Sequence, residues 1–275
     1  MKKQDIMTGI GMLAGVLCVL FGMITGGSGS LAKKMMTFFD AGSIFITLGG
    51  SFAALLINYP IAQLKKMIKV NTEAYKEHTM ESGEIIGEFI NLSRKARREG
   101  LLSLEDGITE IDDNFLKKGL QMVIDGIEPE TIREVMELEI DEMERRHRQG
   151  ADMFKAWAAY APAFGMIGTL IGLIQMLANL SDSSSLASGM SKALITTFYG
   201  SIMANLIFNP IAANLNYKTD IEVASREMML EGVLAIQSGV NPRIVQEKLV
   251  SYLSPEERIK FNETQVSGDE VLSNV

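Results

Sequence analysis

Cysteine and histidine are almost absent from this chain of 275 residues, and most arrangements that carry enzyme chemistry are absent with them. Cys18 is the single cysteine, so no disulfide can form within the chain. The two histidines, His78 and His147, lie in charged stretches without a second ligand at metal-site spacing. A P-loop, a Gly-x-Ser-x-Gly motif and a Cys–His pair are also missing. The sequence therefore predicts neither an enzyme nor a bound cofactor or metal.

Four long windows lack Asp, Glu, Lys, Arg and His altogether. They are approximately residues 6–25, 41–59, 156–180 and 193–217. A hydrocarbon core of about 30 Å needs roughly 20 apolar residues in a helix, and each window meets that need. Helices satisfy their backbone polar groups internally, as lipid requires. We expect an all-α membrane protein with four transmembrane helices in two hairpins.

The first window has an alternative interpretation as a secretory signal, because Lys2 and Lys3 precede it. The apolar run is long, however, and it ends in residues 26–30 without an A-x-A-like cleavage site. We therefore expect a transmembrane helix here.

Basic residues are distributed unequally between the connections. Residues 60–155 hold fifteen Lys and Arg, whereas 26–40 hold two and 181–192 hold only Lys192. By the positive-inside rule, both termini and the central block face the cytoplasm. The predicted domains are a first transmembrane hairpin (1–60), a cytoplasmic helical domain (61–155), a second transmembrane hairpin (156–217) and a helical cytoplasmic tail (218–275). The net charge of −8 argues against nucleic-acid binding.

The central block and the tail show helical patterning. Pro129 suits the first turn of a helix that runs toward Arg148. Gly100 ends an earlier helix, and residues 103–106 (SLED) then have the form of a capping box. In the tail the helical pattern continues to about residue 253, and we expect the residues after Pro255 to be mobile.

Threonines and small residues share faces of the third and fourth windows. The two rows at helical spacing are Gly165, Thr169, Gly172 and Met176, and Ala193, Thr197, Gly200 or Ser201, and Ala204, with Thr196 beside the second row. Close packing of membrane helices alone accounts for such faces. They also suit a channel whose titratable group arrives on another polypeptide. Pro162 and Pro210 near one end of each window favour the channel, since a proline frees backbone carbonyls and marks a bend.

A charged segment lies in the central block. Arg94, Lys95, Arg97 and Arg98 precede Gly100, and Glu105 and Asp106 follow it. Spacing alone favours a solvated helix with its cap, or a patch that faces anionic lipid head groups.

Five segments carry a family resemblance over almost the whole chain. They are RREGLLSLE (97–105), APAFGMIGTLIG (161–172), TTFYG (196–200), NPIA (209–212), and NPR (241–243) followed by KL (248–249). In this order, and with two hairpins around a central block, they resemble the MotA/PomA/MotP family of flagellar motor stator proteins, part of the MotA/TolQ/ExbB superfamily.

The resemblance implies a stator subunit that conducts H+ or Na+ and converts the ion gradient into torque. Five copies would ring two copies of a single-span MotB-type partner, which anchors to peptidoglycan and supplies the ion-binding aspartate. The location implied is the bacterial inner membrane. Threonines at these positions resemble those of sodium-driven members, because hydroxyl and carbonyl oxygens suit a hard cation. Some proton-driven members share the pattern, so sodium is favoured only slightly.

The resemblance also implies roles for individual residues. Thr169 and Thr197 are candidates for the polar niche of the ion pathway, with Thr196 secondary. Pro162 and Pro210 correspond to family prolines that couple ion passage to movement. Arg97 and Glu105 match the contacts with the rotor protein FliG, and Arg94 and Arg98 are placed to share that contact.

Two alternatives predict different behaviour. An ExbB/TolQ-like subunit would energise outer-membrane processes, but those proteins have three spans, and the four windows and the 97–105 motif argue against it. A scaffold whose threonine faces only pack predicts that Thr169→Val and Thr197→Val leave ion flux and motility unchanged.

Overall fold

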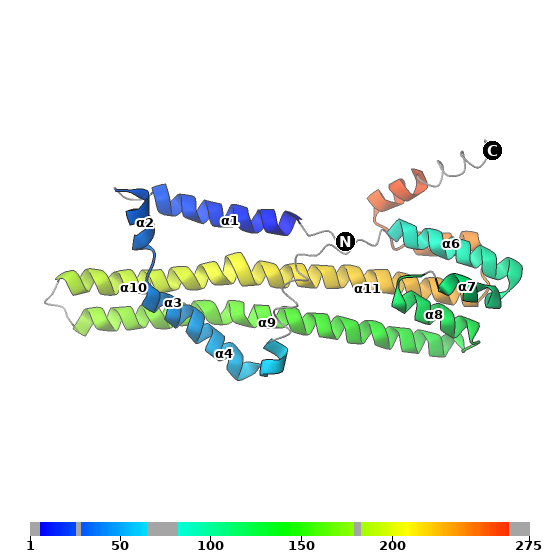
Figure 1. The fold of residues 1–275 in the computed structure, drawn as a ribbon, viewed down its shortest axis with the longest axis horizontal. Coiled ribbons are helices and arrows are strands. Elements are labelled where there is room, and N and C mark those ends of the chain that lie inside the picture. The colour runs from blue at the N-terminus through cyan, green and yellow to red at the C-terminus, as the bar shows by residue number, and fades with distance from the viewer. Residues whose placement is uncertain (1–5, 26–28, 65–81, 110, 179–182, 264–275) are drawn as a thin grey trace. The chain divides into compact units, whose positions relative to one another are not determined.

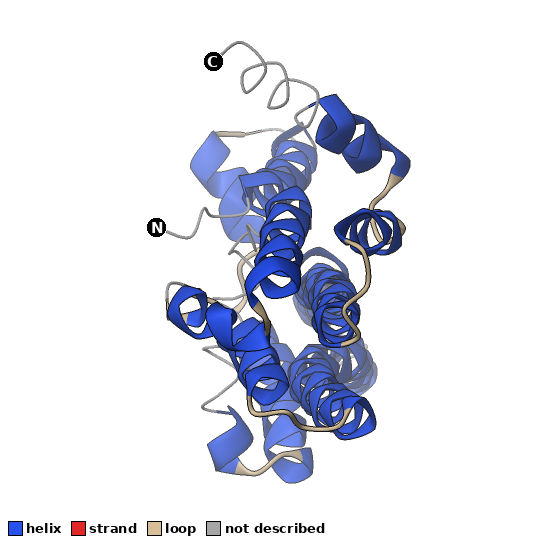
Figure 2. Ribbon diagram, turned by 90° about the vertical axis from the view of Figure 1, so that its right-hand side faces the viewer, coloured by secondary structure: helices blue, strands red, loops and turns tan. Residues whose placement is uncertain are grey.

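All regular structure in the described part of the chain is helical (Figures 1 and 2). The computed structural model describes residues 6–25, 29–64, 82–109, 111–178 and 183–263. Lys2, Lys3 and His78 lie outside these ranges. Four helical stretches in them are long and apolar enough to cross a membrane, namely Thr8–Thr25, Ala41–Asn58, Pro129–Ala178 and Leu186–Gln237. The all-α membrane fold is confirmed.

The chain divides into two compact units, each described by itself. The membrane unit comprises Met1–Glu77 and Arg146–Lys218, and the second unit comprises His78–Arg145 and Thr219–Val275. Helices α9 (Pro129–Ala178) and α11 (Asn209–Gln237) contribute residues to both units. The domain boundaries expected after residues 155 and 217 lie within these continuous helices, and that division stays a prediction.

In its described residues, the membrane unit combines α-helices with two π-helical stretches. Its elements before the later part of α9 are α1 (Ile6–Thr25), α2 (Leu31–Thr37), α3 (Ala41–Ile44), the π-helix η1 (Phe45–Gly49) and α4 (Gly50–Asn58). After α9 come α10 (Ser183–Ile202), the π-helix η3 (Met203–Phe208) and the start of α11. Pro210 lies two residues beyond η3. Because proline lacks an N–H and its ring clashes with the carbonyl four residues earlier, a wider π turn accommodates it.

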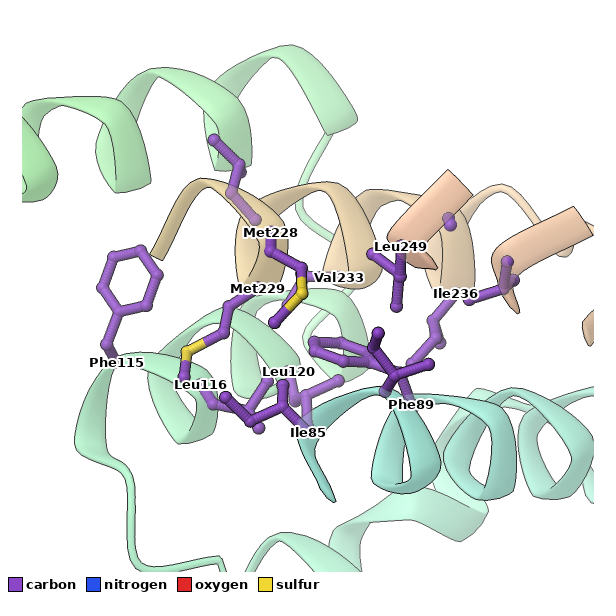
Figure 3. Packing of buried hydrophobic residues seen from close by; sticks show 14 of the residues in the cluster. Ile85, Phe89, Phe115, Leu116, Leu120, Met228, Met229, Val233, Ile236 and Leu249 are labelled. Atoms are coloured by element: carbon purple, nitrogen blue, oxygen red, sulfur yellow. The ribbon is translucent and has the colours of Figure 1, made fainter. Parts of the chain in front are cut away.

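The second unit is held by large apolar side chains. It contains α6 (Ser82–Glu99), the 3₁₀ turn η2 (Leu101–Leu104), α7 (Glu105–Ile108), α8 (Asn114–Ile124), the first part of α9, the end of α11, and α12 (Pro242–Val250). Figure 3 shows side chains of α6, α8, α11 and α12 converging on one cluster. Phe89 is fully buried there, and its ring lies where a Cβ at Gly232 would approach to 2.5 Å.

Two local expectations are wrong. Ser103 does not cap a helix, because its hydroxyl donates back to the Gly100 carbonyl at 2.7 Å within η2. The residues after Pro255 were expected to be mobile, but 256–263 are helical and Phe261 is buried in the core of the second unit; the rest of that segment, 264–275, lies outside the described residues. This helix starts from a true capping box: the Ser254 N–H donates to Glu257 Oε2 at 2.9 Å, and the Glu257 N–H to Ser254 Oγ at 3.3 Å.

Candidate ion pathway

Helices α9 and α10 lie side by side (Figure 1), and several of their glycines stand where the two backbones approach too closely for a side chain. A Cβ at Gly172 would lie 2.7 Å from the Gly189 carbonyl oxygen, and one at Gly200 would lie 2.7 Å from the Ala161 carbonyl oxygen. These are backbone atoms, which cannot move aside as a flexible side chain can. The close-packing interpretation of the small-residue rows is therefore right for their glycines, as expected between membrane helices.

The threonines form a hydroxyl cluster at this contact. The hydroxyls of Thr169, Thr196 and Thr197 lie 3.0, 3.0 and 3.3 Å from the carbonyl oxygen of Ala193. Thr169 Oγ1 and Thr197 Oγ1 are themselves 2.5 Å apart, which joins α9 to α10. Packing alone does not explain this clustering, because valine would fill the same space as threonine without a hydroxyl that needs hydrogen-bond partners.

The threonine hydroxyls of this cluster have more acceptor lone pairs than their own hydrogen bonds use. Each hydroxyl has one proton and two acceptor lone pairs. Thr169 therefore donates to only one of Thr197, Ala193 and Gly165, whose carbonyl is 3.1 Å away. Oxygen lone pairs remain, and Thr197 is exposed on this chain whereas Thr196 is 1% exposed. Thr169 and Thr197 are thus placed to present oxygen to a cation or an acid, and Thr196 is covered.

Hydroxyls of the second membrane segment belong to the same region and were missed from the sequence. Ser43, Thr47 and Ser51 recur every four residues along α3, η1 and α4, and all three are buried. Thr47 Oγ1 lies 2.8 Å from the Ser43 carbonyl oxygen and 3.5 Å from that of Thr196. Ser51 Oγ accepts from Trp157 Nε1 at 3.0 Å. The i, i+4 spacing of these three hydroxyls in an apolar window is a signal in the sequence that could have predicted them.

Asp40, the N-cap residue just before this second segment, is an ionisable residue that the sequence analysis also missed. Its carboxylate accepts from the Ser43 hydroxyl at 2.6 Å and from the Ser43 N–H at 2.7 Å. These bonds, with a smaller contribution from the charge of Lys192, hold the pKa of Asp40 below its ordinary value. Tyr199 of α10 accepts from the Asp40 N–H at 3.2 Å and donates to the Phe38 carbonyl, so it ties this loop to α10.

The two prolines have different surroundings. Pro162 is half-buried within α9, and a Cβ at Gly200 would lie 3.0 Å from its Cα, so it borders the contact with α10. Pro210 is exposed near the start of α11, just after η3. Both positions interrupt the regular ladder of helix hydrogen bonds, which is what a bendable point requires.

Most of the charged segment lies together in the second unit. A groove of about 890 Å³ is lined by Asn91, Arg94, Lys95, Arg97, Arg98, Glu99 and Pro242. Arg94, Arg97 and Arg98 are exposed, and Arg98 makes a 3.6 Å ion pair with its neighbour Glu99. Glu105 is exposed on α7 and is not one of the groove residues. The structure thus gathers the basic members of the candidate rotor contact in one groove, and Glu105 is not among the residues that line it.

Comparison with known proteins decides the family. Residues 108–228 match the MotA/TolQ/ExbB proton channel family. A motility protein A of Borreliella burgdorferi is 47% identical over 84% of this chain and 89% of its own length. The chemotaxis protein PomA of Vibrio alginolyticus is 35% identical over 93% and 98%. The chain belongs to the motility protein A family. A solved structure of the flagellar MotAB stator complex from Bacillus subtilis, covering 92% of this chain and 98% of the compared one, agrees with a TM-score of 0.84 at 34% identity.

Membership in the motility protein A family settles the broad function. The chain is a flagellar motor stator subunit of a proton channel family, a multi-pass protein of the bacterial inner membrane, and not an enzyme. The stator interpretation is thereby favoured over an ExbB/TolQ-like role. The recognition made from the five sequence segments is confirmed.

Proposed function

We propose that Thr169 and Thr197 form the polar niche through which this stator subunit passes its coupling ion. The 2.5 Å contact between their hydroxyls, on spans without a carboxylate of their own, carries the proposal. The acid is an aspartate of a MotB-type single-span partner that anchors to peptidoglycan, and five copies of this chain surround two partners. A charge at mid-membrane costs at least about 2.5–3.5 kcal/mol, so that aspartate needs such oxygens beside it.

Ion passage supplies the energy for movement. One elementary charge that crosses the membrane releases about 2.3 kcal/mol per 100 mV, which is several times the thermal energy. Pro162 and Pro210 are the points at which α9 and the α10–α11 span respond when the partner aspartate changes its charge. Na+ is slightly favoured over H+ because hydroxyl and carbonyl oxygens are ligands for a hard cation.

The output contact lies in the cytoplasm. Both termini and residues 61–155 and 218–275 are on that side of the membrane, in accordance with the distribution of basic residues. Arg97 and Glu105 contact the rotor protein FliG, and Arg94 and Arg98 share the contact through the same basic groove. Exposed ion pairs contribute only about 0–1 kcal/mol each, which suits contacts that are made and broken at every step.

Swimming of stator-deleted cells that express this chain with its partner tests the proposal. Speed is measured as external sodium varies at constant ionic strength, with and without a protonophore. Speed that rises with sodium identifies Na+ as the fuel, and speed that is independent of sodium but abolished by the protonophore identifies H+. Absence of motility, with the partner present in the membrane, would refute the proposal.

Threonine variants test the niche itself. Thr169→Val and Thr197→Val keep the side-chain volume and remove the oxygen, so we expect the ion concentration for half-maximal speed to rise about tenfold or more. Thr25→Val, at an exposed hydroxyl that bonds to the Phe21 and Gly22 carbonyls within α1, is the matched control. Unchanged ion dependence in both variants would support the scaffold alternative.

The rotor contact has its own test. We expect Arg97→Glu combined with Glu105→Lys to abolish torque while ion flux through the complex persists. Intact torque would remove these two residues from the contact.

A further inference from the structure

A polar row continues beyond the niche along the fourth span. Thr197, Ser201, Asn205 and Asn209 follow one another at intervals of four residues, and all four are exposed on this chain. From Thr197 to Asn205 the row extends about 12 Å, given a rise of about 1.5 Å per residue. The earlier positions Met190 and Leu194 on α10 are apolar and exposed. The exposed face of this span therefore changes from apolar to polar at Thr197.

The π-helix η3 keeps this row on one face. In an α-helix each step of four residues turns about 40° past a full circle, so four such residues drift around the axis. A π turn contains more residues, which reduces the turn per residue and offsets that drift. Asn205 lies inside η3 (Met203–Phe208), and Asn209 follows directly after it. The wider turn therefore does more than accommodate Pro210, because it also aligns the two asparagines with Thr197.

The orientation of the Asn205 amide is fixed by its hydrogen bond. Its Nδ2 donates to the Ser201 carbonyl at 3.0 Å. A carbonyl can only accept, so the nitrogen must be the atom that faces it, and Oδ1 points elsewhere. Asn205 thus offers an oxygen to whatever covers this face.

Lipid cannot be what covers this row. A polar group without a partner in hydrocarbon costs several kcal/mol, and polar side chains in membrane spans face a protein interior or water. The Asn205 amide bonds only to backbone of its own span among the bonds described, whereas two other amides in this unit donate to side chains of neighbouring helices: Asn214 to Thr8 Oγ1 at 2.5 Å, and Asn58 to the Tyr160 hydroxyl. Ser201 and Asn205 are exposed instead, on the side of the span that carries Thr197.

We propose that Ser201 Oγ and Asn205 Oδ1 form the exit half of the ion pathway, where a monovalent cation is held after it leaves the Thr169–Thr197 niche. The inference rests on the proposed function, since it assumes that ions reach the niche. Oxygen ligands from a hydroxyl and an amide replace part of the water shell of the cation on its way toward the Pro210 end of the span. Entry and binding at the niche are separate from this step.

The test is ion flux in cells that express this chain with its partner, normalised to the amount of assembled complex in the membrane. Sodium and pH indicators report the two candidate ions. Asn205→Leu should lower maximal flux about tenfold, the loss expected for one ligand to a charge, and should leave the half-saturating ion concentration unchanged or lower. Asn205→Ser, which restores an oxygen, should recover most of the flux. Asn58→Leu is the matched control and should keep wild-type flux per complex.

The outcomes separate this inference from the proposed function. Wild-type maximal flux in Asn205→Leu, together with a raised half-saturating ion concentration in Thr197→Val, would overturn only the exit site. Wild-type maximal flux and wild-type half-saturating concentration in both variants would overturn the pathway as well. A raised half-saturating concentration in Asn205→Leu would place Asn205 at entry and also overturn the exit site. If Asn205→Leu does not assemble, Ser201→Ala tests the exit site, because it removes one oxygen and hardly any volume. We expect the maximal flux of this variant to be about threefold lower, and unchanged flux would refute the proposal.

Discussion

The interior packing of the two units of this protein relies on different residues: large apolar ones in the second unit, and glycine and threonine at the α9–α10 contact of the membrane unit. In the second unit, large side chains such as Phe89, Leu116 and Met229 fill one buried cluster. At the α9–α10 contact of the membrane unit, glycines let backbones touch and leave room for threonine hydroxyls. Water drives apolar groups together, but lipid tails are as apolar as leucine, so membrane helices associate through close approach and hydrogen bonds. A contact built of small residues is also one along which polar atoms can line a path.

The largest effect should come from the core of the second unit. Phe89→Ala should lower the free energy of local unfolding by about 3–5 kcal/mol, because it removes a fully buried ring and leaves a cavity. Hydrogen exchange of residues 82–99 in the full-length protein measures this. Leu102→Ala is the control, since Leu102 is 73% exposed, and should change little.

A second substitution sharpens this prediction. Gly232→Ala should destabilise the wild type because its Cβ would approach the Phe89 ring to 2.5 Å, but it should cost little in the Phe89→Ala background. Simple additivity of the two changes would contradict the described packing.

The glycine contact of the membrane unit should show a smaller but clear loss. Gly200→Ala adds one methyl group that would lie 2.7 Å from the Ala161 carbonyl and 3.0 Å from Pro162 Cα, so the helices must separate. We expect a loss of about 1–3 kcal/mol, measured as unfolding in mixed micelles. Gly22→Ala on α1, where nothing lies within 4 Å, is the matched control. Equal behaviour of the two variants would mean that α9 and α10 do not rely on close approach.

Sequence reasoning reached the fold and the family but not every local detail, for physical reasons. Absence of charge over about 20 residues is a direct consequence of lipid, so the spans could be read without a structure. The two capping-box sequences show the limit of prediction from sequence. Residues 103–106 have the capping-box sequence but do not cap a helix, whereas Ser254 and Glu257 have it and form the capping hydrogen bonds. Pro255, at the first helical position, favours helix formation directly after Ser254. Before residues 103–106, Gly100 has φ +86°, and in the 3₁₀ turn that follows it the Ser103 hydroxyl donates to the Gly100 carbonyl instead of capping a helix.

The same limit applies to the candidate ion pathway. Thr169 and Thr197 stood out because hydroxyls are conspicuous in apolar windows. The π turns could not be predicted from the sequence. In a regular α-helix, residues at i+4 spacing such as Ser201 and Asn205 rotate progressively away from the helix face that carries Thr197, so the sequence alone does not group them with it. The glycines of the two rows are packing residues and the threonines form a polar cluster, so close packing accounts for part of the contact and the channel interpretation of the threonines stays a prediction.

The capping box of the second unit should contribute a pH-dependent increment. Hydrogen bonds from Ser254 hold the pKa of Glu257 below its ordinary value of 4.5. A lowered folded-state pKa means that the stabilisation is present above that ordinary value and is lost as the pH falls through the folded-state pKa. Ser254→Ala should therefore cost about 1 kcal/mol at neutral pH, seen as faster hydrogen exchange in residues 255–263. Glu257→Ala should differ from wild type at neutral pH and converge with it in acid, and a pH-independent difference would refute this account.

The smallest predicted effects compare one polar contact from each unit. The Trp157 Nε1–Ser51 Oγ bond should show a coupling of about 0.6 kcal/mol in a cycle of Trp157→Phe and Ser51→Ala, as hydrogen bonds between membrane helices typically do. The 3.0 Å ion pair of Arg133 with Glu231 in the second unit should show about 0–1 kcal/mol. The two differ in salt dependence, because ions screen an exposed charge pair but not a neutral bond between spans. Raising the salt concentration should therefore weaken only the Arg133–Glu231 coupling. A salt-sensitive Trp157–Ser51 coupling would show that this contact is open to water, and the contrast between the two units would fail at that point.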